Sequence, residues 1–102
     1  MPIFVKVAST FDLKPGSAMT VTANGTEIAL YNVAGKIYAT NNTCLHQGGP
    51  LGEGQLEGNV VTCPWHGWQF NVTTGKAVMN PNAGVACYRA EVRDDGIYID
   101  TA

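Results

Sequence analysis

No window of a dozen residues in this 102-residue chain has the apolar spacing of an amphipathic helix. Short runs of β-branched and aromatic residues recur instead, and each run is closed by residues that favour a turn. The sequence therefore predicts an all-β fold, in which antiparallel strands form a sandwich or a barrel.

Turn signals indicate which strands pair. Asn24-Gly25 tolerates the positive φ angles of a tight hairpin turn, and it separates a run at 19–23 from a run at 26–33. Ala34-Gly35 then leads to a third run at 36–40. Near the end of the sequence, the residues at 94–96, Asp-Asp-Gly, link a run at 85–92 to a run at 97–100 and predict a second hairpin.

The segment 41–80 differs from the rest of the chain. It holds seven of the twelve glycines and only three charged residues, so we expect mostly loop there. Trp65, Trp68 and Phe70 lie in the same segment, and a solvated linker would not carry them. We expect one domain of residues 1–102, in which 41–80 is a small insertion between the two parts of a base, 1–40 and 81–102.

Composition excludes several classes of partner. The net charge is −2, and the 8 acidic and 6 basic residues are scattered singly, which is not the basic surface that nucleic acid or an anionic membrane requires. No apolar run approaches the roughly 20 residues that span a bilayer, and the first residues do not resemble a secretory signal. We expect a soluble, cytoplasmic protein. Three cysteines with this spacing favour thiol ligands or buried thiols over disulfides.

Two Cys/His pairs form a possible metal site: Cys44-x-His46 and, after sixteen intervening residues, Cys63-x-x-His66. Two thiolates and two imidazoles are a complete set of four ligands that suits zinc, copper or iron. Zinc fingers usually supply two cysteines and then two histidines, whereas here each segment supplies one of each. If the cysteines bind one iron and the histidines another, the two loops could hold a two-iron cluster with Rieske ligation.

The stretches Cys44-Leu-His46 and Cys63-Pro-Trp-His66-Gly-Trp resemble the motif of Rieske proteins, and they are most similar to the stand-alone Rieske ferredoxins of bacterial ring-hydroxylating dioxygenase systems. The resemblance covers nearly the whole chain. It implies a Rieske fold with a cluster-binding insertion and one [2Fe-2S] cluster as cofactor. It further implies that Cys44 and Cys63 bind one iron, and that His46 and His66 bind the other.

The same resemblance implies a one-electron carrier that passes electrons from a flavin-dependent NAD(P)H reductase to a terminal oxygenase, here of an aromatic-ring dioxygenase system. The chain would not itself be an enzyme, because both of its histidines are ligands and none is left for a mononuclear iron or a general base. Two alternatives are a Rieske-like small subunit of a nitrite reductase and a zinc-stabilised interaction module. We expect a monomer, since a carrier presents one face to two partners in turn.

Departures from the family pattern indicate a low reduction potential. Rieske proteins of cytochrome bc complexes have a disulfide that clamps the cluster, and its two places are taken here by Gly49 and Trp65. Their Ser and Tyr hydroxyls, which donate to sulfur, are replaced by Trp68 and Phe70. Without these donors the reduced cluster is less stabilised, so we expect a potential near −150 mV rather than near +300 mV.

The neighbouring residues suggest further roles. Cys87 matches no ligand position and lies in an expected strand, so we predict a buried core thiol. Pro81 resembles the proline-containing third loop that covers the cluster in this family. Four residues beside the ligands are expected either to form an apolar rim where a partner docks or to shield the cluster from water: Leu45, Gln47, Pro64 and Trp65.

Overall fold

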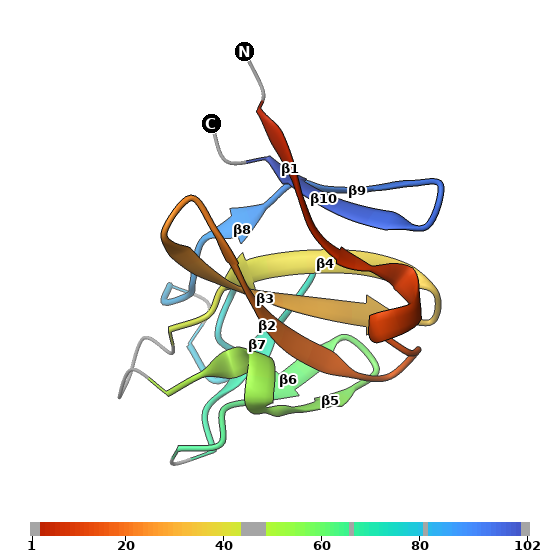
Figure 1. Cartoon of the computed structure of the whole chain (residues 1–102). Helices are drawn as coiled ribbons and strands as arrows, with labels where there is room; N and C mark the ends of the chain where they lie inside the picture. The colour runs from red at the N-terminus through yellow and green to blue at the C-terminus, as the bar shows by residue number, and fades with distance from the viewer. Residues whose placement is uncertain (1–2, 44–48, 66, 81, 101–102) are drawn as a thin grey trace.

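The computed structural model describes residues 3–43, 49–65, 67–80 and 82–100, and in these ranges the chain forms three antiparallel sheets. The first sheet has the order β1-β10-β9, the second β2-β3-β4-β8 and the third β5-β6-β7 (Figure 1). The strands are β1 (Phe4–Ser9), β2 (Ala18–Ala23), β3 (Thr26–Val33), β4 (Lys36–Asn41), β5 (Gln55–Glu57), β6 (Val60–Thr62), β7 (Gln69–Asn71), β8 (Cys87–Tyr88), β9 (Ala90–Arg93) and β10 (Gly96–Asp100). The predicted all-β fold is confirmed.

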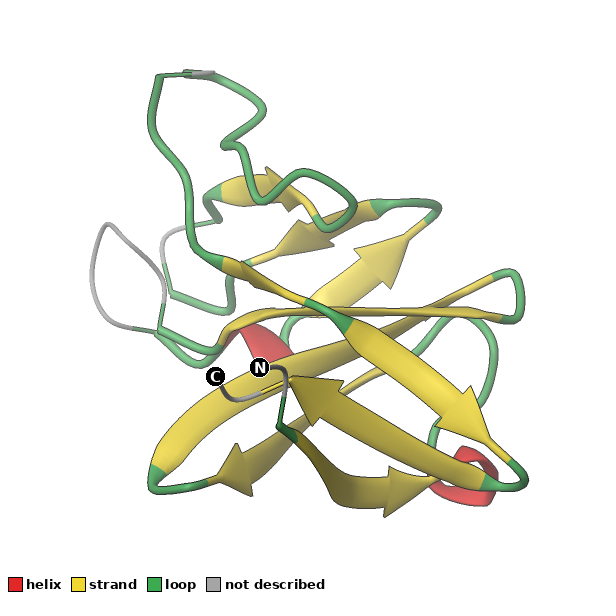
Figure 2. Cartoon of the chain, turned by 90° about the horizontal axis from the view of Figure 1, so that it is seen from above, coloured by secondary structure: helices red, strands yellow, loops and turns green. Residues whose placement is uncertain are grey.

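Helical structure in the described ranges consists of two short 3-10 turns, η1 (Thr10–Asp12) and η2 (Leu51–Glu53). In these ranges no helix has the length and apolar character needed to cross a membrane. Figure 2 shows how strands and connecting loops make up almost all of the fold.

The two turn dipeptides produce the hairpins that the sequence predicts. Asn24 and Gly25 have φ angles of 49° and 79°, which connect β2 to β3 in a tight reversal. Ala34 and Gly35 have φ angles of 53° and 96°, and they connect β3 to β4 in the same way. The register runs without a break from Ala18 opposite Tyr31 to the first turn, so the β2–β3–β4 meander is regular.

The run at 85–92, which the sequence predicts as one strand, forms two strands in different sheets. β8 pairs with β4, whereas β9 pairs with β10 across the predicted hairpin. The break falls at Arg89, whose carbonyl accepts a hydrogen bond from the Asp100 N–H at 3.0 Å. The chain changes sheets there, so each half of the run satisfies its backbone groups on a different neighbour.

Strand β3 lies at the centre of the fold and is buried on both faces. Ile28 and Leu30 face one hydrophobic core together with Ile97 and Ile99 of β10 and Leu13. The alternate residues of β3 face a second core, which contains Ala29, Tyr31, Leu51, Val61, Cys63, Phe70, Val72 and Ala77. Because successive side chains point to opposite faces, the whole run at 28–32 is buried. The fold therefore has three layers, with the second sheet in the middle.

The third sheet and η2 both lie within the segment 41–80 that the sequence marks as distinct. This sheet packs on the second core beside the loops that hold the predicted ligands. The division of the chain into a base and an inserted cluster-binding part stays a prediction.

Candidate metal centre

Of the four predicted ligands, Cys63 lies in the described part of the chain. Cys44, His46 and His66 lie outside the described residues, and so do Leu45, Gln47 and Pro81. Within the described ranges, no three His, Cys, Asp or Glu side chains are grouped so that they could hold a metal ion. The ligand set stays a prediction, and its support comes from the residues on either side.

The first ligand loop begins where β4 ends and returns to η2. Thr43 and Pro50 form an isolated antiparallel bridge that brings its two ends together. The Thr43 N–H donates to Oδ1 of Asn41 at 2.9 Å. Next to the bridge, on the side of the central sheet, the Leu51 N–H donates to the Asn42 carbonyl at 2.7 Å. Both ends of the loop are thereby fixed to the central sheet.

The second ligand loop is the connection between β6 and β7. Thr62 pairs with Gln69 at the end of the two strands, and the Cys63 N–H donates to the Trp68 carbonyl at 2.7 Å. Cys63 is 1% exposed and belongs to the second core together with Phe70. The Cys63 thiol is therefore a candidate metal ligand that is held in a fixed position and largely shielded from water.

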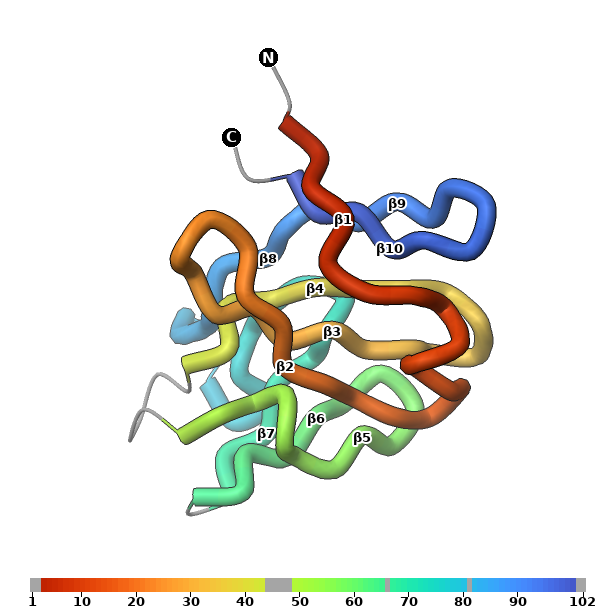
Figure 3. Tube along the Cα trace, viewed as in Figure 1, coloured from red at the N-terminus to blue at the C-terminus, as the bar shows by residue number. Residues whose placement is uncertain are grey.

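The two loops touch each other through described residues. A Cβ placed on Gly49 of the first loop would lie 2.8 Å from Sγ of Cys63 and 3.1 Å from Cβ of Trp65. Contacts of that kind are too close for real side chains, so the first loop reaches this position only because residue 49 is glycine. In Figure 3 the end of β4 and the connection between β6 and β7 lie on the same side of the molecule. Gly49, which follows the first half of the motif in the chain, therefore lies against Cys63 of the second half.

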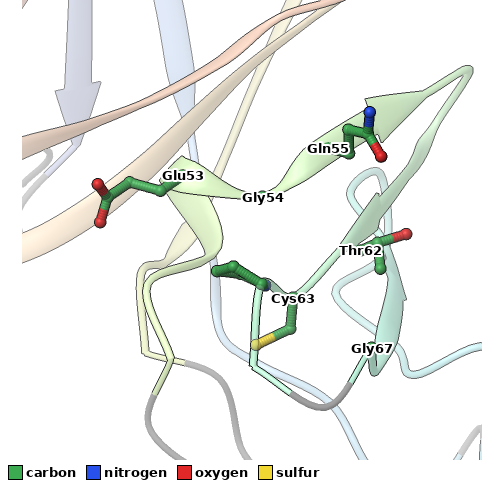
Figure 4. Close-up of a pocket in the computed structure, with 7 residues that line it drawn as sticks. Glu53, Gly54, Gln55, Thr62, Cys63 and Gly67 are labelled. Atoms are coloured by element: carbon green, nitrogen blue, oxygen red, sulfur yellow. The ribbon is translucent and has the colours of Figure 1, made fainter.

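A cleft of about 380 Å³ lies beside Cys63. Its lining is formed by Glu53, Gly54, Gln55, Thr62, Cys63, Pro64 and Gly67. In Figure 4 the Cys63 side chain extends away from Gln55 and Thr62. Among the described residues of this lining, Glu53 is the one charged side chain.

The prediction for Cys87 is wrong: its side chain is exposed rather than buried in the core. β8 is the edge strand of its sheet, and an edge strand leaves part of its surface to solvent. The sulfur lies beside Gly75, and partial burial raises the pKa of the Cys87 thiol above its ordinary value. A thiol with a raised pKa is mostly protonated near neutral pH and is a weak nucleophile and metal ligand.

Comparison with known proteins decides between the possible metal centres. The profile of the Rieske [2Fe-2S] domain matches residues 3–89. The chain belongs to the Rieske [2Fe-2S] family. This Rieske protein is 36% identical over 98 residues to the ferredoxin component of the naphthalene 1,2-dioxygenase system of Pseudomonas putida, a match that covers 95% of this chain and 94% of that one.

Solved structures agree with this assignment. A chain from the complex of reduced oxygenase and oxidised ferredoxin in carbazole 1,9a-dioxygenase is 36% identical, with a TM-score of 0.87 over 96% of this chain and 93% of that one. The carbazole 1,9a-dioxygenase ferredoxin from Nocardioides aromaticivorans is 27% identical, with a TM-score of 0.89 over 100% and 99% of the two chains. The fold is thus that of Rieske ferredoxins.

The two alternatives gain little from these comparisons. A nitrite reductase small subunit has a TM-score of 0.82 over 95% of this chain and 97% of that one, but it is 20% identical, which shows a common fold alone. The family assignment gives the Rieske protein a [2Fe-2S] cluster as cofactor in place of structural zinc. The described residues fit this group: a buried cysteine thiol, a soft ligand of the kind iron–sulfur clusters take, lies where the two loops meet.

Proposed function

We propose that this Rieske protein is a one-electron carrier that accepts electrons from a flavin-dependent NAD(P)H reductase and passes them to the terminal oxygenase of an aromatic-ring dioxygenase system. The whole-length similarity to a ferredoxin component of such a system carries the proposal. The Rieske domain matches residues 3–89, and its cofactor is one that takes up and gives up a single electron. We also propose that it works as a monomer in the cytoplasm.

The proposed ligands are Cys44, His46, Cys63 and His66. When bound, the [2Fe-2S] cluster supplies a site that gains and loses a single electron. Two thiolates and two neutral imidazoles contribute less negative charge than four thiolates would, which favours the reduced state. The side chain of Cys63 is almost completely buried, so the sulfur of this proposed ligand is shielded from water.

Trp65 is the described residue best placed to meet a redox partner. It is 51% exposed and lies one position from the proposed ligand His66, next to Pro64, which is exposed as well. Redox partners usually bury a small interface and separate quickly, so one large aromatic side chain can contribute much of the binding energy.

Replacing Trp65 with alanine should therefore lower kcat/KM for reduction of the oxygenase about tenfold, since losing an interface aromatic costs about 1.4 kcal/mol or more. Stopped-flow oxidation of the reduced carrier by the oxygenase measures this. Phe11→Ala is the matched control, because Phe11 is 76% exposed on η1, away from the ligand loops. Equal rates for the wild type and Trp65→Ala would remove Trp65 from the docking surface.

The reduction potential is expected near −150 mV, and Phe70→Tyr should raise it. Phe70 is fully buried in the core that also holds Cys63, and it has no donor for a sulfur atom. A new hydrogen bond of about 1–1.5 kcal/mol in favour of the reduced state corresponds to about 40–65 mV for one electron. Spectroelectrochemical titration measures the shift. Phe4→Tyr, on β1, should leave the potential unchanged.

The carrier function is tested by reconstitution. Purified chain is mixed with NAD(P)H, a flavin-dependent ferredoxin reductase and the terminal oxygenase of an aromatic-ring dioxygenase, and product formation is followed. Turnover that requires the chain, with reduction of the chain visible in its absorbance, is the expected result. A chain that is colourless, contains stoichiometric zinc and leaves turnover at the background rate would contradict the proposal.

A further inference from the structure

A buried asparagine stands directly before the first ligand loop. Asn42 is 3% exposed and follows the last residue of β4. Its side-chain Oδ1 accepts two hydrogen bonds, one from Oγ1 of Thr20 at 3.1 Å and one from the N–H of Gly52 at 2.7 Å. One oxygen atom thus links β2 to η2.

The backbone of Asn42 adds two more links. Its N–H donates to the carbonyl of Glu27 on β3 at 3.3 Å, and its carbonyl accepts from the N–H of Leu51 at 2.7 Å. Asn42 therefore holds the outgoing end of the loop to β2 and β3, and it holds the returning end through Leu51 and Gly52. The bridge between Thr43 and Pro50 is the next residue pair along the two ends of the loop, one position further from the sheet than Asn42 and Leu51.

The returning end of the loop leads to the contact between the two ligand loops. Pro50 connects Leu51 to Gly49, and Gly49 packs against Sγ of Cys63 without room for a Cβ. A shift of Leu51 and Gly52 would be transmitted along this short path to the cysteine sulfur. An apolar side chain at position 42 could not accept the two hydrogen bonds, and it would leave the buried N–H of Gly52 without an acceptor.

We propose that Asn42 is a positioning residue, which sets the spacing of the two ligand loops by fixing both ends of the first one. The inference rests on the proposed function, in which Cys44 and His46 of this loop are ligands. Asn42 then acts on the metal centre through the returning end of the loop, Leu51, Pro50 and Gly49.

The test compares Asn42→Ala with the wild-type protein as isolated, with its cluster. The variant is expected to lose the cluster to an iron chelator about 10- to 100-fold faster, the usual effect of removing a group that orients metal ligands. The electron paramagnetic resonance line shape of the reduced variant is also expected to change, because ligand geometry sets it.

Asn32→Ala is the matched control. Asn32 is also a buried asparagine, at 7% exposure, with Nδ2 donating to the Leu13 carbonyl at 2.9 Å and Oδ1 accepting from the Gly35 N–H at 2.7 Å. It lies at the opposite end of the β3–β4 ladder from the ligand loop. The control should lose a similar amount of thermal stability, yet keep the wild-type rate of cluster loss and the wild-type line shape.

A second pair of variants covers the case in which Asn42→Ala does not fold. Thr20→Val removes the hydroxyl at nearly constant shape, whereas Thr20→Ser keeps it. Thr20→Val should speed cluster loss by less than Asn42→Ala would, because the bond from Gly52 remains, and Thr20→Ser should behave like the wild type.

Two results would overturn the positioning role: equal rates of cluster loss for Asn42→Ala and Asn32→Ala at equal thermal stability, or, when only the second pair folds, equal rates for Thr20→Val and Thr20→Ser. Failure of the proposed function looks different, because wild-type protein would then leave oxygenase turnover at the background rate in the reconstitution, whatever its rate of cluster loss.

Discussion

Replacing Cys63 with serine is expected to give a folded chain that holds almost no iron or acid-labile sulfide. A serine hydroxyl stays protonated near neutral pH and is a poor ligand for the iron of a metal–sulfide cluster, whereas a thiolate is the ligand that such clusters take. Cys63 is 1% exposed and packs against Gly49 of the first loop, so water does not readily take the place of its sulfur. Iron and sulfide analysis with visible absorbance measures the loss, and circular dichroism measures the fold.

Cys87→Ser is the matched control for this substitution. Cys87 is exposed on the edge strand β8 and matches no ligand position of the Rieske motif. This variant should keep the full iron and sulfide content. A Cys63→Ser protein with the wild-type content of iron and sulfide would show that Cys63 is not a cluster ligand. A Cys87→Ser protein without a cluster would show that Cys87 is needed to hold it.

Gly49→Ala is expected to produce the second largest effect, although it adds a single methyl group. The added Cβ would lie 2.8 Å from Sγ of Cys63 and 3.0 Å from Cγ of Trp65, so one of the two loops must move. Overpacking of this kind typically costs about 1–3 kcal/mol, and here the strain falls on the sulfur of a proposed ligand. We expect cluster loss to a chelator at least tenfold faster than in the wild type, in line with other changes that misplace metal ligands.

Gly16→Ala separates this local effect from a general loss of stability. Gly16 has a φ of +83°, so alanine is strained there by about 1–2 kcal/mol, but an added Cβ would have no atom within 4 Å. This variant should melt at a lower temperature and still retain its cluster. If the two alanine variants lose the cluster equally fast, the close contact between Gly49 and Cys63 is not what holds the loops in place.

Much of the fold follows from local chemistry. Asn24, Gly25 and Gly35 readily take positive φ angles, so the β2–β3–β4 meander could be predicted from the sequence, although Ala34 also takes a φ of 53°, which alanine disfavours. The break at Arg89 could not, because the choice of sheet for each half of the run depends on partners far away in the chain.

The candidate site, too, could be predicted from the sequence only in part. The motif containing Cys63 could be recognised because cluster ligation needs particular residue types at particular spacings. Burial could not be read from the same pattern: Cys87 lies in a strand as expected, but on an edge, and so it is exposed. Asn42 gave no signal, since an asparagine before a loop usually faces solvent, and its two hydrogen bonds come from β2 and η2.

The central claim, a [2Fe-2S] cluster held by two cysteines and two histidines, is tested most directly by pulsed electron paramagnetic resonance on the reduced protein with ¹⁵N-labelled histidine. The chain contains only two histidines, so any histidine coupling must come from His46 and His66. We predict couplings from two histidine nitrogens to the electron spin of the cluster. A reduced cluster whose spin couples to no histidine nitrogen would contradict the account.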